Sequence, residues 1–169
     1  KKELKSAGMK VALLSTAETT AMVFMIFLGA DMMNATLALT EMPKMVAMWV
    51  SGLPVAPLGI VMAVLVLYIV LGCVMDELSM LLLTIPVIFP AVMALDLWSL
   101  SYELKALWFG ILVLMTVSFG LIAPPVGLNV YVVNGMAKDV PLSESYKGIM
   151  PFLISDTLRT LLLLFFPGV

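Results

Sequence analysis

A run of 32 residues (106–137) carries no charged side chain, yet Pro124 and Pro125 stand side by side near its middle. The run is longer than the roughly 20 apolar residues that cross a bilayer as one helix. Proline has no N–H and therefore frees the carbonyl four residues before it, which here belongs to Gly120 and to Leu121. The sequence thus predicts one crossing made of two half-helices with a short unwound link between them.

The whole chain is too apolar for a water-soluble domain. Hydrophobic residues make up 63% of it and charged residues 12%, whereas soluble domains are nearer a quarter charged. We therefore expect an all-α integral membrane protein in contact with the lipid bilayer. The absence of histidine excludes a Ser-His-Asp triad, and the single cysteine excludes a disulfide framework or a thiolate metal cluster. We expect no organic cofactor, and no basic face suits nucleic acid.

Apolar and polar stretches divide the chain into four parts of one domain. These are a first transmembrane helix with an interfacial arm that carries Trp49 (1–53), a hairpin of two apolar arms (54–98), the broken crossing (106–137) and a last transmembrane helix (149–169). If the broken segment crosses once, six lysines face the cytoplasm, and Lys44 and Lys105 face outside. If it turns back at the prolines, four lysines face the cytoplasm and four face outside. The positive-inside rule favours the single crossing.

The connection between the two arms of the hairpin contains Asp76 and Glu77. If each arm spans the membrane, this acidic pair is a solvated cytoplasmic turn. If the hairpin is re-entrant, the pair lies at membrane depth, where only protein or water can satisfy it. The residues alone leave both alternatives open. In either case Asp76 is a suitable N-cap for the second arm, with Ser79 three positions later.

The ends of the two half-helices predict an ion and anion site. The first half-helix ends with free carbonyls and partial negative charge, and the second begins with free N–H groups and partial positive charge. At bilayer depth such carbonyls can coordinate Na⁺ and such N–H groups can hold a carboxylate, as in the broken helices of secondary transporters. Gly127 permits a tight bend, and Asn129 adds a side-chain amide. The alternative is a plain proline kink repaired by neighbouring helices.

Other acidic residues support weaker hypotheses. Glu18 lies inside the first apolar segment, where it can make a polar contact between helices or bind an ion. Asp156 and Arg159 are three residues apart on the last helix, so we expect them to pair with each other. An intramembrane enzyme could use Asp76 and Glu77 as an acid pair, but adjacent helical residues point about 100° apart. A purely structural subunit is a further alternative.

Two stretches resemble a known family. The segment 120–152, "GLIAPPVGLNVYVVNGMAKDVPLSESYKGIMPF", is similar to the C-terminal signature of the large membrane subunit of TRAP (tripartite ATP-independent periplasmic) transporters, the DctM-like permeases. The segment 72–90, "GCVMDELSMLLLTIPVIFP", resembles the second hairpin of that family. The run Pro-Pro-Val-Gly-Leu-Asn is the most specific part of the resemblance, which covers nearly the whole chain.

The resemblance implies two inverted repeats, each with a re-entrant hairpin and a discontinuous helix, of which this chain holds the second. Because it begins Lys1-Lys2-Glu3, without an initiator Met, we expect a piece of a longer chain. The implied activity is Na⁺-driven, elevator-type import of dicarboxylates or sialic-acid-like acids, or another ion-coupled anion transport on the same repeat design. The implied partners are a periplasmic binding protein, a small four-helix membrane subunit and the N-terminal repeat, in the bacterial inner membrane.

Together, the half-helix argument and the resemblance predict two sets of site residues. Cation binding is expected at Gly72, Asp76, Ser79, Gly120, Leu121, Ala123 and Gly127, and substrate binding at Pro124, Pro125, Val126 and Asn129. One residue departs from the family pattern, which often has a threonine where this chain has Ala123. A hydroxyl ligand there would have to be replaced by backbone carbonyls, or by Thr116 or Ser118.

Overall fold

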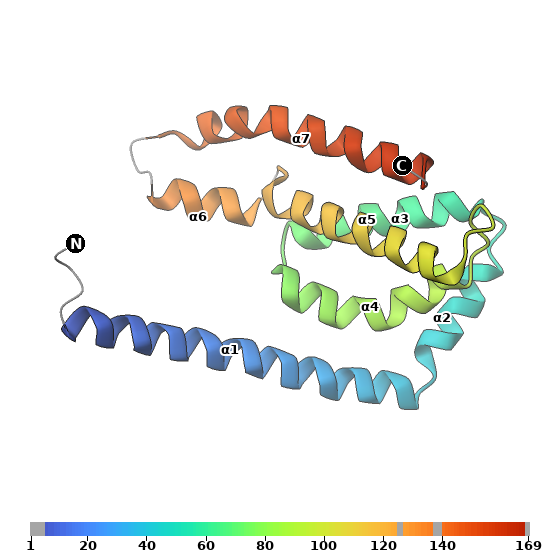
Figure 1. The fold of residues 1–169 in the computed structure, drawn as a ribbon, viewed down its shortest axis with the longest axis horizontal. Helices are drawn as coiled ribbons and strands as arrows, with labels where there is room; N and C mark the ends of the chain where they lie inside the picture. Colours follow the sequence, from blue (N-terminus) through green and yellow to red (C-terminus); the bar gives the residue numbers. More distant parts are fainter. Residues whose placement is uncertain (1–5, 125–126, 137–139, 168–169) are drawn as a thin grey trace.

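The computed structural model describes residues 6–124, 127–136 and 140–167, and within these ranges the chain forms seven α-helices and no strand (Figure 1). The helices are α1 (Ser6–Leu39), α2 (Met42–Ser51), α3 (Pro57–Gly72), α4 (Glu77–Met93), α5 (Tyr102–Ile122), α6 (Leu128–Met136) and α7 (Leu142–Phe165). Three of them, α1, α5 and α7, are long and apolar enough to cross a membrane. The predicted all-α architecture with membrane-spanning helices is confirmed at this level.

The hydrophobic core lies where α3, α4 and α5 meet, and α2 packs against α4. Tyr68, Met80, Phe109 and Leu112 are among its fully buried side chains. A hydrogen bond of 2.9 Å joins the hydroxyl groups of Tyr68 on α3 and Thr84 on α4. A buried hydroxyl without a partner is costly in an apolar interior, so this bond holds the two arms of the hairpin together.

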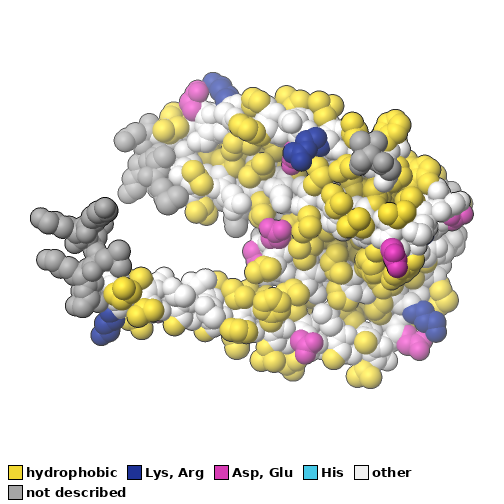
Figure 2. Space-filling model, in the orientation of Figure 1, with side chains coloured by type: hydrophobic (Ala, Val, Ile, Leu, Met, Phe, Trp, Pro, Cys, Tyr) yellow, Lys and Arg dark blue, Asp and Glu magenta, His cyan; other side chains and the backbone are white. Residues whose placement is uncertain are grey.

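The long helices α1 and α7 lie on opposite sides of this core (Figure 1). Through its second half, α1 contacts α2 and α4. Its half-buried residues recur at helical spacing and are Val23, Ile26, Ala30, Asn34 and Leu37. The first half of α1 projects away, and an open hollow separates it from α6 and α7 (Figure 2). Hydrophobic side chains cover much of the visible surface, as suits a protein in lipid.

The first helix is longer than the apolar stretch 11–30 indicates, because polar residues continue it to Leu39. The Thr36 hydroxyl, for example, donates to the carbonyl of Met32 within the helix, over 2.9 Å. The chain then turns at Glu41, whose φ is 51°. The short helix α2 follows, with Val50 in the core and an exposed Trp49. The helix therefore presents apolar side chains both to the core and to the surface, where Met45, Met48 and Trp49 are exposed.

A lysine of α5 closes the C-terminal end of α4. Lys105 is only 9% exposed. Its ammonium group donates to the carbonyl of Met93 over 3.3 Å and to the carbonyl of Leu95. A cation at this position satisfies free carbonyls and the partial negative charge of the helix end. The base of the hairpin is thereby fixed to α5.

Candidate functional site

The uncharged run is interrupted between α5 and α6, which stand where the two half-helices were predicted. The last residue of α5 is Ile122, and Ala123 is extended, with φ −71° and ψ 138°. The Ala123 N–H still donates to the carbonyl of Phe119 over 2.9 Å. In Figure 1, α6 continues in line with α5 on the other side of the interruption. Two of the predicted site residues, Pro125 and Val126, lie outside the described residues.

Gly127 has the left-handed backbone conformation that the bend requires, with φ 53°. A Cβ at this position would lie 3.0 Å from the carbonyl oxygen of Ile122 and 3.2 Å from that of Ala123. Its own carbonyl accepts from the N–H groups of Val130 (2.8 Å) and Tyr131 (3.2 Å), which starts α6. Glycine is therefore required both by the backbone angle and by the close approach to the end of α5.

The end of α5 presents carbonyls that have no helical partner. Pro124 and Pro125 lack the N–H groups that would bond the carbonyls of Gly120 and Leu121. Both of these residues are buried. The partial negative charge of the helix end is concentrated on such free carbonyls. This end of α5 is therefore a candidate for holding a cation.

The tip of the hairpin is a tight turn that ends in a capped helix. The Met75 N–H donates to the carbonyl of Leu71 over 2.8 Å. The Asp76 carboxylate accepts from the backbone N–H of Ser79 over 2.9 Å, which confirms the predicted N-cap of α4. Asp76 is exposed and Ser79 is half-buried. The cap fixes the direction in which the returning arm leaves the tip.

A contact between two glycines sets the hairpin tip against the end of α5. A Cβ on Gly120 would lie 2.9 Å from the carbonyl oxygen of Ile69 and 3.0 Å from the Cα of Gly72. A Cβ on Gly72 would in turn lie 3.1 Å from the Cα of Gly120. The two backbones therefore touch, as happens where small residues let apolar helices cross closely. Both glycines were candidates from the sequence, but their contact was not predicted.

Other predicted site residues are not brought into this contact. Within the described residues, no hydrogen bond joins Asp76 or Ser79 to α5 or α6. Asn129 is exposed on α6, a helix that packs against α5 and α7. The described structure thus places Gly72 and Gly120 together, with Leu121 and Ala123 following on the same chain end, while Asp76, Ser79 and Asn129 stand apart.

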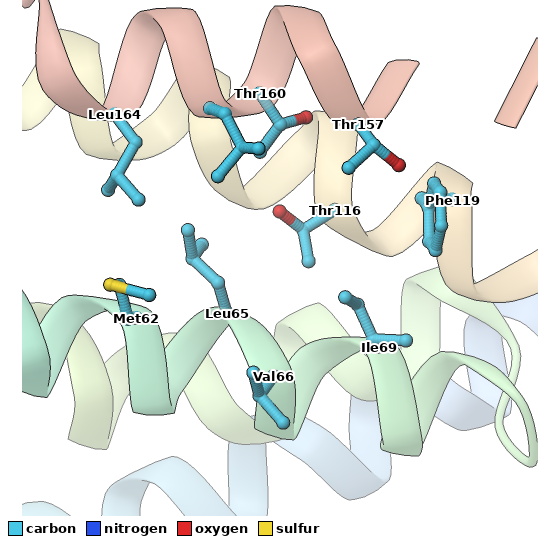
Figure 3. A pocket seen from close by; sticks show the side chains of 10 residues that line it. Met62, Leu65, Val66, Ile69, Thr116, Phe119, Thr157, Thr160 and Leu164 are labelled. Carbon is cyan, nitrogen blue, oxygen red and sulfur yellow. The ribbon is translucent and has the colours of Figure 1, made fainter. Parts of the chain in front are cut away.

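An apolar groove of about 160 Å³ runs between α3, α5 and α7 (Figure 3). Thr116, Thr157 and Thr160 bring hydroxyl groups to it. The Thr116 hydroxyl donates to the carbonyl of Leu112 over 2.7 Å, and the Thr157 hydroxyl donates to that of Leu153 at the same distance. Thr116 was a candidate to replace the hydroxyl missing at position 123. It faces the groove, and its oxygen retains acceptor capacity.

The ligands available to a cation are mainly neutral oxygens. In the described ranges, no three histidine, cysteine or acidic side chains come close enough together to hold a metal ion. The oxygens that the structure brings to the end of α5 include backbone carbonyls and the Thr116 hydroxyl. Such ligands suit a hard monovalent ion better than a transition metal.

Two polar contacts lie outside this region, and the sequence predicted one of them. Asp156 and Arg159 pair with each other on α7, as predicted, with an oxygen–nitrogen distance of 3.7 Å. Asn134 was not singled out from the sequence. Its amide donates to the carbonyl of Val140 over 2.8 Å and to the Ser145 hydroxyl over 3.2 Å, which ties α6 to the start of α7. The sequence feature that could have pointed to this role is the position of Asn134 just before a predicted polar loop.

Comparison with known families decides the assignment. The family model for the DctM component of tripartite ATP-independent periplasmic transporters matches residues 1–169. The chain belongs to this DctM family. Family membership confirms the resemblance of the 72–90 and 120–152 segments. It also assigns the chain to transporter permeases and not to enzymes, so the acid-pair alternative has no support.

Curated relatives have names that agree with this assignment. A Haemophilus influenzae protein provisionally named TRAP transporter large permease is 31% identical over 95% of this chain and 38% of its own length. The C4-dicarboxylate TRAP transporter large permease of Pseudomonas aeruginosa is 26% identical over 93% of this chain and 35% of its own. The sialic acid TRAP transporter large permease of Vibrio cholerae is 26% identical over 90% of this chain and 34% of its own length. No solved structure matches the chain.

The chain therefore spans less than two fifths of the length of these DctM relatives. Transport by a DctM permease is a property of the whole protein.

Proposed function

We propose that this chain is the C-terminal repeat of a Na⁺-coupled permease of the bacterial inner membrane that imports organic acids. The observation that carries the proposal is the backbone contact between Gly72 and Gly120. It sets the tip of one hairpin against the end of α5, where Pro124 leaves a carbonyl unpaired. Two interrupted elements that meet in this way are the usual setting of ion and substrate sites in secondary transporters.

The lengths of the hairpin arms support a re-entrant hairpin. Helix α3 has 16 residues, so it is about 24 Å long. Helix α4 has 17 residues and is about 26 Å long. Both are shorter than the hydrocarbon core, which is roughly 30 Å thick. We infer that the tip stops inside the membrane, where Gly72 packs against Gly120 of α5.

Cation binding comes first in the proposed cycle. Na⁺ would be held by the carbonyl oxygens of Gly120 and Leu121 and by oxygens of the hairpin tip, with Thr116 as an additional acceptor. The ion neutralises the partial negative charge at the end of α5. That neutralisation favours the arrival of an anion at the neighbouring start of α6, and this linkage couples the two fluxes.

The substrate carboxylate would bind at the start of α6. The first N–H groups of a helix have no helical acceptor and carry partial positive charge. Gly127 orients them by its left-handed backbone, and Asn129 can add its side-chain amide. The named relatives include permeases for C4-dicarboxylates and sialic acid. A carboxylate is the chemical group that these two classes of substrate share.

The proposed transporter needs further components. The N-terminal repeat would supply the second hairpin and the second broken helix, so this chain alone should not transport. A periplasmic binding protein would deliver the substrate, and a small membrane subunit would pack against the permease. Domain movement would be of the elevator type, with the two hairpins and broken helices moving together.

The test is uptake by the full-length permease, reconstituted in proteoliposomes with its small subunit and its binding protein. We expect accumulation of labelled C4-dicarboxylate or sialic acid under an inward Na⁺ gradient, and loss of accumulation when K⁺ replaces Na⁺. Uptake that is unaffected by removing Na⁺ would contradict the coupling. Gly120→Ala, which places a Cβ against the carbonyl of Ile69, should reduce uptake severely.

Gly110→Ala is the matched control, because it lies on the same helix and a Cβ there meets nothing within 4 Å. The control should transport like the unchanged protein. Equal uptake by the Gly110 and Gly120 variants would show that the close contact of the tip with α5 is not needed.

A further inference from the structure

Among the described residues, one side-chain hydrogen bond joins α1 to the returning arm of the hairpin. The amide nitrogen of Asn34 on α1 donates to the backbone carbonyl of Leu82 on α4 over 3.4 Å. Leu82 lies in the middle of a regular helix, where a carbonyl normally accepts from the N–H four residues later. A side chain from another helix is an unusual partner at such a position.

Proline explains why the carbonyl of Leu82 is available. Pro86 lies four residues after Leu82, inside α4. It has no N–H, so the helical hydrogen bond to Leu82 cannot form. A carbonyl left without a partner in apolar surroundings is costly. Asn34 supplies the donor that Pro86 lacks.

The position of Asn34 on α1 makes this bond specific. The half-buried stripe of α1 is otherwise apolar, with Val23, Ile26, Ala30 and Leu37 as its other members. Apolar contacts are not directional and allow a helix to slide along its neighbour. The side-chain oxygen of Asn34 is buried and has no partner in the described part of the chain. Burial of this amide is therefore unfavourable unless its nitrogen is bonded.

We propose that Asn34 is a positioning residue that docks α4 on α1 in one register, through the carbonyl that Pro86 frees. A single buried polar residue in an apolar helix contact sets register in this way in other helical assemblies. Because α4 leads directly from the hairpin tip, the docking also fixes where Gly72 meets α5. This consequence for ion binding rests on the proposed function, whereas the docking itself does not.

A double-mutant cycle on the full-length permease tests the docking. Asn34→Leu, which is close in size but has no donor, should lower the temperature of thermal unfolding by several degrees. Pro86→Ala restores an N–H at position 86, which can bond to Leu82 directly. In the Pro86→Ala background, Asn34→Leu should therefore have a much smaller effect, because the two residues share one acceptor.

Pro90→Ala is the control for the cycle. It also removes a proline from α4, but the carbonyl of Leu82 still lacks a helical donor and still depends on Asn34. The loss caused by Asn34→Leu should persist in that background. The proposal would be overturned if Asn34→Leu lowered the unfolding temperature equally in the Pro86→Ala background. It would also be overturned if Asn34→Leu alone did not lower the unfolding temperature. If Asn34→Leu does not assemble, Asn34→Asp, which keeps the shape, replaces it in the same cycle.

Uptake measurements add a readout that packing alone would not change. Asn34→Leu should raise the Na⁺ concentration for half-maximal uptake by about two- to tenfold, the range that one ordinary hydrogen bond gives. Adding Pro86→Ala should return it towards the original value. A uniform loss of uptake at every Na⁺ concentration, unchanged by Pro86→Ala, would overturn the link to the tip. Absence of Na⁺-driven uptake in the unchanged protein would refute the proposed function and leave the unfolding cycle to decide the docking.

Discussion

Two of the proline pairs in this chain differ in their effect on the helices that contain them. Pro86 and Pro90 lie inside α4, which remains one helix from Glu77 to Met93. Pro124 and Pro125 separate α5 from α6. Prolines in apolar segments are therefore not equivalent, and the surrounding residues decide whether a helix continues or stops.

Spacing is the first cause of the difference. Prolines four apart each remove one helical hydrogen bond, and the residues between them can stay helical. Adjacent prolines remove two successive bonds, and the residue before each proline is pushed out of helical geometry. Ala123 shows this directly, because its ψ is 138°. Gly127, with φ 53°, then completes the turn.

Compensation by neighbouring helices is the second cause. The carbonyl of Leu82, freed by Pro86, receives a hydrogen bond from Asn34, although no side-chain donor is found among the described residues for the carbonyl of Pro86, which Pro90 frees. The carbonyls of Gly120 and Leu121 receive no side-chain donor among the described residues. A freed carbonyl that is bonded supports a structural kink, whereas one that stays free is available to an ion.

The largest expected effect comes from restoring the helix at the second pair. Pro124→Ala combined with Pro125→Ala supplies both missing N–H groups, so α5 and α6 should join and Na⁺-driven uptake should fall to background. The free energy of unfolding should not fall, because a proline inside a helix costs about 3 kcal/mol. Proteoliposome uptake and thermal unfolding measure the two quantities. The matched variant, Pro86→Ala with Pro90→Ala, should keep most of its uptake. Equal losses in both variants would remove the distinction between the two regions.

The next effect concerns the capped end of α4. Lys105→Met leaves the carbonyls of Met93 and Leu95 without their donor, which should cost about 2 kcal/mol of unfolding free energy. Chemical denaturation of the purified permease measures the change. Lys44→Met is the control, since the Lys44 side chain is 68% exposed and pairs with Glu41, three residues before it. That change should cost less than about 1 kcal/mol. If Lys105→Met left the unfolding free energy unchanged, the end of α4 would not need this cap.

A smaller effect is expected at the turn into α6. Gly127→Ala forces a left-handed backbone on a residue with a Cβ, which costs about 1–2 kcal/mol, and the Cβ also approaches Ile122. Gly135→Ala on α6 is the control, because a Cβ there meets nothing within 4 Å. That change should be neutral or stabilising, by up to about 1 kcal/mol. Thermal unfolding of both variants tests this. Stability unchanged by Gly127→Ala would mean that the turn does not need glycine.

The smallest effect is expected at the N-cap of α4. Asp76→Asn keeps an oxygen that accepts from Ser79, so unfolding free energy should change by less than about 0.5 kcal/mol. Asp76→Ala, the comparison variant, removes the cap and should cost about 1 kcal/mol. Differential scanning calorimetry of the two variants measures both changes in unfolding free energy. A large loss with asparagine would indicate that the negative charge at the tip matters beyond capping.

Local features of the fold could be predicted from the sequence. The separation of α5 from α6 follows from proline chemistry, and the cap by Asp76 follows from its spacing to Ser79. The pair of Asp156 and Arg159 follows from helical spacing. Each of these depends on residues within a few positions of one another, so no knowledge of the tertiary structure is needed.

Tertiary contacts could not be predicted in this way. The contact of Gly72 with Gly120 and the bond from Asn34 to Leu82 join residues that are far apart in the sequence. The sequence indicates only that Lys105 faces outside, and the packing of α4 on α5 shows that it is buried. An amide or a lysine in a sequence does not indicate which distant carbonyl it will meet.

The most direct measurement of the central claim uses Cys73, the chain's one cysteine, which is buried beside Gly72 at the hairpin tip. Maleimide modification of the peptide that contains Cys73 can be followed by mass spectrometry in the full-length permease, in NaCl and in KCl of equal ionic strength. If Na⁺ binds between the tip and the end of α5, it holds the tip closed. Modification should then be several-fold slower in NaCl, and the difference should vanish in the Pro124→Ala, Pro125→Ala variant. Equal rates in the two salts for the unchanged protein would contradict the account.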